Sequence, residues 1–81
     1  RMQVAVPGGI HMAVAASLGQ IAKESDAYVF LRSGKRMASA GEIHKVLALG
    51  VRRLDWVELI VDGGEEEESV MERIEKLLCR K

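Results

Sequence analysis

The beginning of the chain carries two hydrophobic patterns in succession. Met2, Val4 and Val6 occupy every second position, and the sequence PGG at residues 7–9 then interrupts the alternation. A period of two is typical of a strand with one buried face, so we expect a short strand from Met2 to Val6. Residues 12–23 instead have the spacing of an amphipathic helix. Its apolar face consists of Val14, Ala15, Leu18, Ile21 and Ala22.

Three later segments predict strands. Residues 27–32 and 35–39 flank Ser33-Gly34, which is typical of two antiparallel strands joined by a tight turn. The sequence WVELIV at residues 56–61 alternates again, and DGG at residues 62–64 breaks it. The chain therefore has a hairpin in its middle and a fourth strand before its last quarter.

Two further helices are predicted between and after these strands. The sequence SAGE at residues 39–42 has the spacing of a capping box with Ser39 as the cap, and Gly50 can end the helix after about two turns. The acidic run at residues 65–68 opens the last helix, where negative charge suits the helix dipole. The apolar faces are Ile43, Val46 and Leu47 in the first helix and Val70, Ile74, Leu77 and Leu78 in the second. Basic residues close the last helix at Lys76, Arg80 and Lys81.

The order of elements is strand, helix, strand, strand, helix, strand, helix. Each helix has one apolar stripe, and three such stripes can cover one face of a four-stranded sheet. We therefore expect an α+β fold, an open-faced two-layer sandwich. Its 81 residues are the length of one domain, so residues 1–81 are expected to form a single domain.

The uncovered face of this sheet is expected to carry every aromatic side chain of the protein. If Val29 and Leu31 face the helices, the alternating residues face away from them, and the same holds along residues 56–61. We call the outward-facing set the outer aromatic patch: Tyr28, Phe30, Trp56 and Ile60. It is either a scatter of exposed residues, a sign that the register is shifted by one, or a surface for weak self-association or for a neighbouring protein.

Charge and cysteine content narrow the class of protein. The chain has 12 basic and 12 acidic residues, and its only basic cluster, Arg52-Arg53, is short, so neither nucleic acid nor an anionic membrane is expected as a partner. Cys79 is the lone cysteine, which excludes an internal disulfide and favours the cytoplasm, and its charged neighbours predict an exposed thiol. No membrane span or signal peptide is expected.

His11 is the first candidate for chemistry. It stands in GGIHMAVAASL, behind a glycine pair and directly ahead of the predicted helix. A histidine there either caps the helix or lies on the surface with no further role. Alternatively, a ring nitrogen lies where free backbone N–H groups converge, those of Met12 and Ala13 first, and these amides can hold an anion attached to the ring.

Three segments together resemble the HPr family, the histidine-containing phosphocarriers of the bacterial sugar phosphotransferase system. GGIHMAVAA is similar to the family's Gly-Leu-His-x-Arg-Pro-Ala-Ala signature, LALGV to its Leu-Gly hinge, and VELIVDGGEEEESVMERIEKLL to its last strand, acidic turn and closing helix. The likeness extends over the whole chain without a large insertion. It implies an HPr-like four-stranded antiparallel sheet covered on one face by three helices.

The resemblance also implies a function. His11 would be phosphorylated on a ring nitrogen by enzyme I and would pass the phosphoryl group to enzyme IIA domains. Such a protein is a stoichiometric carrier, not an enzyme, and it needs no cofactor. An imidazole is a competent nucleophile near neutral pH. Carried over by position, the family's partner-binding surface consists of Met12, Ala16, Ile43, His44, Leu47 and Ala48.

Three positions depart from the family pattern. Ala13 and Val14 stand where the signature has arginine and proline, which removes charge-assisted hydrogen bonds worth roughly 1.5 to 3 kcal/mol each. His11 is then phosphorylated slowly, receives positive charge from a partner, or has lost the chemistry. Glu42 occupies the position of a regulatory serine found in some members. Its carboxylate either stabilises the helix start or imitates the charge of the phosphorylated serine.

Two other functions compete with the carrier. A regulatory interaction module would use the same fold and surface to bind a transcriptional regulator or an enzyme without carrying phosphate, and Ala13 and Glu42 favour it. A metal site would have to use His11, His44 and Cys79, which lie far apart in the sequence without ligand spacing. We therefore expect no bound metal.

Overall fold

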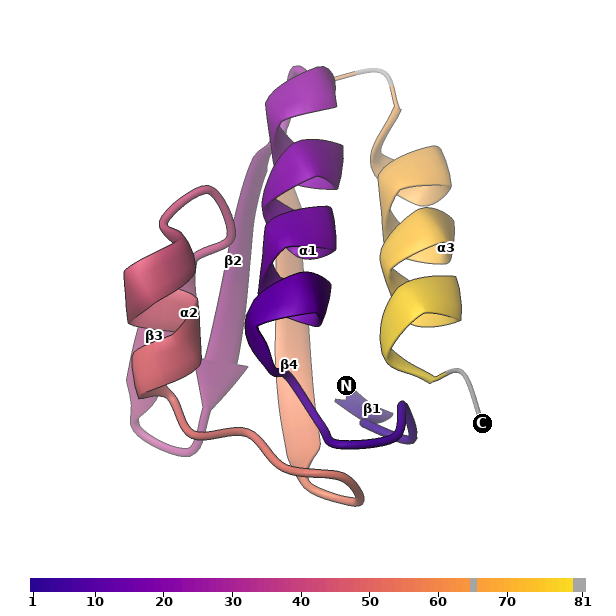
Figure 1. The fold of residues 1–81 in the computed structure, drawn as a ribbon. Coiled ribbons are helices and arrows are strands. Elements are labelled where there is room, and N and C mark those ends of the chain that lie inside the picture. The colour runs from indigo at the N-terminus through magenta and orange to yellow at the C-terminus, as the bar shows by residue number, and fades with distance from the viewer. Residues whose placement is uncertain (65, 80–81) are drawn as a thin grey trace.

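A computed structural model shows the predicted α+β sandwich, and it describes residues 1–64 and 66–79. The strands are β1 (Met2–Gln3), β2 (Tyr28–Ser33), β3 (Arg36–Ser39) and β4 (Trp56–Asp62). The helices are α1 (Met12–Glu24), α2 (Ile43–Ala48) and α3 (Glu67–Leu78). Figure 1 shows the three helices side by side in front of the sheet. The fold class predicted from the sequence is confirmed.

The sheet is antiparallel throughout, with the strand order β1-β4-β2-β3. The hairpin strands β2 and β3 meet with Ser33 opposite Arg36, and β2 pairs along its length with β4, where Phe30 lies opposite Ile60. The turn between β2 and β3 needs a left-handed backbone, which Gly34 provides with a φ of +62°. The sequence therefore located this turn correctly.

The core lies between the sheet and the helices, as the apolar stripes indicate. Side chains of β2 and β4 that point toward the helices are buried, and each helix contributes residues with no exposed surface, such as Leu18 and Ile74. Burial of such a side chain stabilises the fold by about 1.5 to 3 kcal/mol. The structure has no buried polar or charged residue among those it describes.

The outer face of the sheet carries the outer aromatic patch, as predicted. Tyr28 is 72% exposed and Trp56 is 52% exposed, whereas Phe30 and Ile60 lie half-buried as cross-strand neighbours. The register predicted from the alternation is therefore correct. The guanidinium of Arg1 lies 5.1 Å from the centre of the Trp56 ring, a cation–π contact at one end of this face.

Two local predictions are wrong. The first strand ends at Gln3 rather than Val6, because the N–H groups of Ala5 and Val6 donate to the carbonyl of Leu78 at the end of α3 and not to a neighbouring strand. Ser39 is not a helix cap: its pairing with Phe30 keeps it extended as the last residue of β3.

The boundaries of α2 and α3 also differ from the prediction. Glu42 takes the cap position of α2, and Gly50, with a φ of +66°, follows the helix end as expected. α3 begins at Glu67, inside the acidic run. The predicted roles of Glu65, Arg80 and Lys81 fall outside the described residues. No helix in the described ranges has the length and apolar character needed to cross a bilayer.

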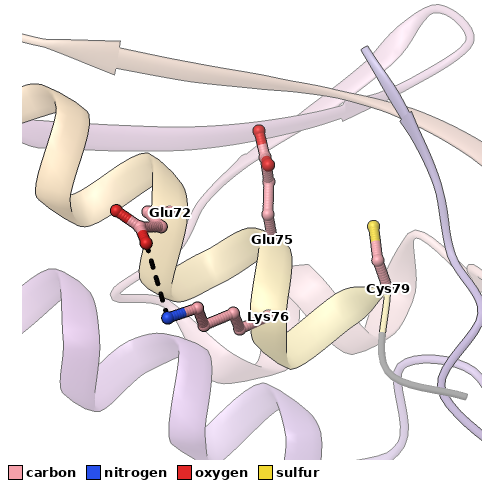
Figure 2. A pocket seen from close by; sticks show the side chains of 4 residues that line it. All are labelled: Glu72, Glu75, Lys76 and Cys79. Carbon is pink, nitrogen blue, oxygen red and sulfur yellow. Dashed lines mark ion pairs between the residues drawn. The ribbon is translucent and has the colours of Figure 1, made fainter.

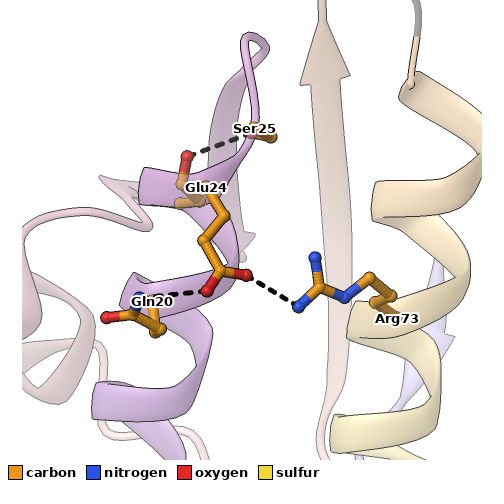
Figure 3. A network of polar contacts seen from close by, with 5 residues as sticks. Gln20, Glu24, Ser25 and Arg73 are labelled. Atoms are coloured by element: carbon orange, nitrogen blue, oxygen red, sulfur yellow. Dashed lines mark hydrogen bonds and ion pairs between the residues drawn. The ribbon is translucent and has the colours of Figure 1, made fainter.

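A polar network joins the end of α1 to the middle of α3 (Figure 3). Gln20 donates a hydrogen bond of 3.1 Å to one carboxylate oxygen of Glu24, and Arg73 donates one of 2.9 Å to the other. The hydrogen bond from Gln20, together with the bond and positive charge of Arg73, holds the pKa of Glu24 below its ordinary value. The network links the two helices at their surface, since the side chains of Glu24 and Arg73 are both about half exposed.

Candidate functional site

His11 takes the cap position of α1 with its backbone but not with its side chain. Its φ and ψ of −94° and −177° are extended, and its carbonyl accepts the first helical hydrogen bond, 2.8 Å from the N–H of Ala15. The imidazole makes no capping hydrogen bond and the residue is exposed. The side chain is therefore not used to end the helix.

The ring of His11 lies against Gly8. A Cβ atom built on Gly8 would approach the ring carbon Cδ2 to 3.1 Å and Nε2 to 3.8 Å. The φ of Gly8, +82°, is also one that glycine adopts without strain. The first glycine of the pair thus leaves room for the imidazole beside the loop.

Three backbone donors at the start of α1 have no hydrogen-bond acceptor in the described parts of the chain. They are the N–H groups of Met12, Ala13 and Val14, since the N–H of His11 donates to the carbonyl of Gly9 at 3.1 Å. Unpaired donors of this kind and the positive end of the helix dipole favour an anion. The amides predicted from the sequence, those of Met12 and Ala13, therefore do begin the helix directly after the histidine.

A second loop, residues 51–54, packs against the His11 loop. In the sequence, Arg52-Arg53 was recognised only as a short basic cluster and not as a neighbour of His11. The N–H of Ile10 donates to the carbonyl of Val51 at 3.1 Å. A Cβ on Gly9 would lie 2.7 Å from Cα of Arg52 and 2.8 Å from the backbone nitrogen of Arg53. The two backbones touch at Gly9. In the sequence, only Gly9 and the Arg52-Arg53 pair could have pointed to this contact.

The residues assigned to a partner surface lie on α1 and α2, two helices that pack together. Gly19 of α1 allows the close approach, with the side chain of Ile43 and the carbonyl of Ala40 next to it. Met12 is 57% exposed. Of the remaining members, three are exposed and two are half-buried: Ala16, His44 and Ala48, then Ile43 and Leu47. A shallow hollow at the start of α2 is lined by residues 41–45.

Glu42 stands at the cap position of α2 without a capping hydrogen bond from its side chain. Its carboxylate instead forms an ion pair of 3.1 Å with Lys45. Both side chains are more than half exposed, so the pair contributes little stability. The carboxylate of Glu42 thus lies on the surface, paired with Lys45, at the shallow hollow at the start of α2.

A separate surface hollow on α3 contains none of the residues predicted for phosphoryl transfer or for partner binding. Its lining is Glu72, Glu75, Lys76 and Cys79, and Glu72 and Lys76 form an ion pair of 3.4 Å across it (Figure 2). Cys79 is half-buried at this surface and its thiol donates to the carbonyl of Gln3 at 3.4 Å, so the thiol is less exposed than predicted. Within residues 1–64 and 66–79, no group of three or more metal-ligating side chains is gathered.

The sequence as a whole matches one protein family. The family model described as "PTS HPr component phosphorylation site" matches residues 1–79. The chain belongs to the HPr family. Family and fold together indicate a phosphocarrier protein of the phosphotransferase system, and the resemblance proposed from the sequence is confirmed.

Solved HPr structures share the fold at low sequence identity. HPr from Thermoanaerobacter tengcongensis is 22% identical with a TM-score of 0.86, covering 95% of this chain and 85% of its own. HPr from Bacillus anthracis is 21% identical with a TM-score of 0.85, covering 95% and 90%. The Bacillus subtilis protein Crh, described as a swapped dimer, is 26% identical with a TM-score of 0.76, covering 95% and 87%. A search of curated proteins finds no match.

Proposed function

We propose that this HPr-family protein accepts a phosphoryl group on His11 from phosphorylated enzyme I and passes it to enzyme IIA domains. One observation carries the proposal. The imidazole of His11 is exposed, forms no cap, and stands at the start of a helix whose first three amides lack acceptors in the described chain. A nucleophile and a cradle for the added charge are therefore adjacent.

The imidazole is the only group of this chain that forms or breaks a bond to phosphorus. The lone pair of a ring nitrogen forms a bond to phosphorus while the bond between phosphorus and the donor breaks. In the second transfer the acceptor attacks phosphorus, and the N–P bond returns its electron pair to the ring. His11 is thereby restored, so the protein is a stoichiometric carrier and not an enzyme. The amides of Met12 and Ala13 stabilise the anionic oxygens while the group is carried.

The surface of α1 and α2 supports docking of enzyme I and enzyme IIA. Exclusion of water from a transferring phosphoryl group suppresses hydrolysis, and an apolar contact close to the histidine achieves this. Met12 suits several partners because its flexible thioether side chain adapts to different surfaces. We extend the proposed surface to Ala16, Ile43, His44, Leu47 and Ala48. The same proposal places the protein in the cytoplasm, where a lone cysteine stays reduced.

Two residues favour a second candidate, a regulatory module that binds a regulator or enzyme without carrying phosphate. Ala13 supplies no cation beside His11, and Glu42 displays a fixed carboxylate on α2. The two candidates differ in whether His11 gains a phosphoryl group.

Intact-mass spectrometry after incubation with enzyme I and phosphoenolpyruvate separates the candidates. The chain has two histidines, so His11→Asn and His44→Asn form a matched pair of exposed substitutions. The carrier proposal expects a mass gain of one phosphate in the native chain and in His44→Asn, and none in His11→Asn. Phosphate on His44 alone would reject His11 as the acceptor. No label on the native chain, with a standard HPr labelled in parallel, would favour the regulatory module.

Self-association through the outer aromatic patch is a further partner proposal. Its support is the exposure of Tyr28 and Trp56 on a sheet face that no helix covers, with Phe30 and Ile60 between them. The ion pair of Arg32 and Glu58, 3.7 Å apart, interrupts this patch between Ile60 and Trp56, and a surface broken by charges suits a stable interface poorly. The proposal is therefore limited to weak association at high concentration.

A further inference from the structure

A phosphoryl group on His11 would carry about two negative charges, and α1 provides no cation to face them. The first turn of the helix consists of Met12, Ala13 and Val14, which are apolar. Backbone amides supply only partial charges, equivalent to roughly half an elementary charge for a whole helix end. If this chain itself supplies a full positive charge, another element next to His11 must carry it.

The loop of residues 51–54 is the element that reaches this place. Gly9 lies two residues before His11, and a Cβ on Gly9 would be 2.7 Å from Cα of Arg52. Chain geometry then limits the separation of the Arg52 and His11 Cα atoms to about 12 Å. An arginine and a phosphohistidine are both long side chains, and together they can close a gap of this size.

Arg52 and Arg53 differ in what already holds them. The Nε of Arg53 donates to the carbonyl of Ala5 at 3.4 Å. Ala5 lies six residues before His11 in the sequence. Arg52 is fixed at its backbone, where its N–H donates to Oδ2 of Asp55 at 2.8 Å. Its guanidinium has no hydrogen bond or ion pair to the residues that the structure describes. The backbone of Arg52 is thus held in place, while its guanidinium is free to bind another group.

We propose that the guanidinium of Arg52 binds the phosphoryl group carried by His11, an inference that rests on the proposed function. A guanidinium matches phosphate because it donates two parallel hydrogen bonds in a planar fork. The contact between Gly9 and the 51–54 loop positions this donor, and the amides of Met12 and Ala13 complete the oxygen ligands from the helix. Arg52 is a phosphate-binding residue, so its charge contributes whenever the phosphoryl group is present.

The test compares Arg52→Ala with the matched control Arg53→Ala in single-turnover transfer from phosphorylated enzyme I. Loss of a charge-assisted hydrogen bond pair is expected to slow transfer to Arg52→Ala about 10- to 100-fold. Arg53→Ala should remain within about threefold of the native rate. The urea midpoint of Arg52→Ala should be unchanged, because its side chain is exposed and holds no other group.

A second variant separates a charge effect from a structural one. Adding Ala13→Arg to Arg52→Ala restores a guanidinium beside His11 and should recover most of the lost rate. Native transfer rates in Arg52→Ala would overturn this inference while leaving His11 as the carrier. Equal losses in Arg52→Ala and Arg53→Ala would also overturn it, since the effect would then be one of general charge. A native chain that takes no phosphate overturns both the inference and the proposed function.

Discussion

Replacement of Gly9 by alanine tests the contact that joins the His11 loop to residues 51–54. Gly34→Ala is the matched control, because Gly34 has a similar φ of +62° against +69° but no atom within 4 Å of a new Cβ. A left-handed alanine costs roughly 1–2 kcal/mol, partly offset by about 0.4–1 kcal/mol from the stiffer unfolded chain. Gly34→Ala should therefore destabilise the protein by about 0.5–1 kcal/mol.

Gly9→Ala adds two penalties that the control does not have. The new Cβ would meet backbone atoms at 2.7 and 2.8 Å, and overpacking of this kind costs about 1–3 kcal/mol. Separation of the loops also strains the hydrogen bond from Ile10 to Val51, worth about 0.5–1.5 kcal/mol. The total destabilisation of Gly9→Ala is therefore about 2–5 kcal/mol. A domain of this size loses about 4–8 °C of Tm for each kcal/mol of stability lost.

Thermal unfolding followed by circular dichroism measures both variants under the same conditions. Gly9→Ala should unfold at least about 6 °C below Gly34→Ala, because its two added penalties amount to about 1.5–4.5 kcal/mol. Phosphoryl transfer to Gly9→Ala, measured well below its unfolding temperature, should also be slowed. Equal Tm values for the two variants would refute the backbone contact, and with it the placement of Arg52 beside His11.

The remaining predictions concern one strained residue, one network and one surface. Leu54 has a φ of +78°, so the variant Leu54→Gly should be about 0.5–1 kcal/mol more stable than Leu54→Ala in urea unfolding. At Met37, equally 57% exposed but not at positive φ, Ala should be the better residue, and the same order at both sites would contradict the strain. Because the folded-state pKa of Glu24 is lowered, its stabilisation is present above the ordinary value of 4.5 and is lost as the pH falls through the folded-state pKa. Glu24→Gln should therefore lose less stability than the native chain between pH 7 and pH 3, and an equal loss would show that the network does not matter. Trp56→Lys should abolish any concentration-dependent rise in mass in sedimentation experiments, and an unchanged rise would exclude the outer aromatic patch as the contact.

Local patterns predicted the elements because each has one buried face. The alternation along β2 and β4 placed Val29 and Leu59 in the core and the aromatic residues outside, and the structure agrees. The pattern failed beyond Gln3. The side chains of Val4 and Val6 are buried as expected, but Val4 bonds irregularly to Leu54 and Asp55 ahead of β4, and the N–H of Val6 donates to Leu78 of α3. Side-chain burial follows from the sequence period, whereas the hydrogen-bond partner of a backbone group depends on tertiary packing.

The candidate site was predictable only where it is local in the sequence. The position of His11 at the start of α1 follows from the neighbouring pattern, and so do the amides of Met12 and Ala13. The approach of Arg52 to Gly9 joins segments more than forty residues apart, and no spacing rule gives it. Ser39 illustrates the opposite error: a local capping signal lost to the pairing of β3 with β2.

The carbonyl of Leu78 accepts hydrogen bonds from the N–H groups of both Ala5 and Val6, so the far end of α3 supports the segment that leads into the His11 loop. Figure 1 shows the first strand and the end of α3 lying close together. Shortening α3 by its last turn would remove this acceptor and loosen the chain just ahead of Pro7. A deletion at the C-terminal end of α3 should thus change the loop that carries His11, although His11 lies near the opposite end of the sequence.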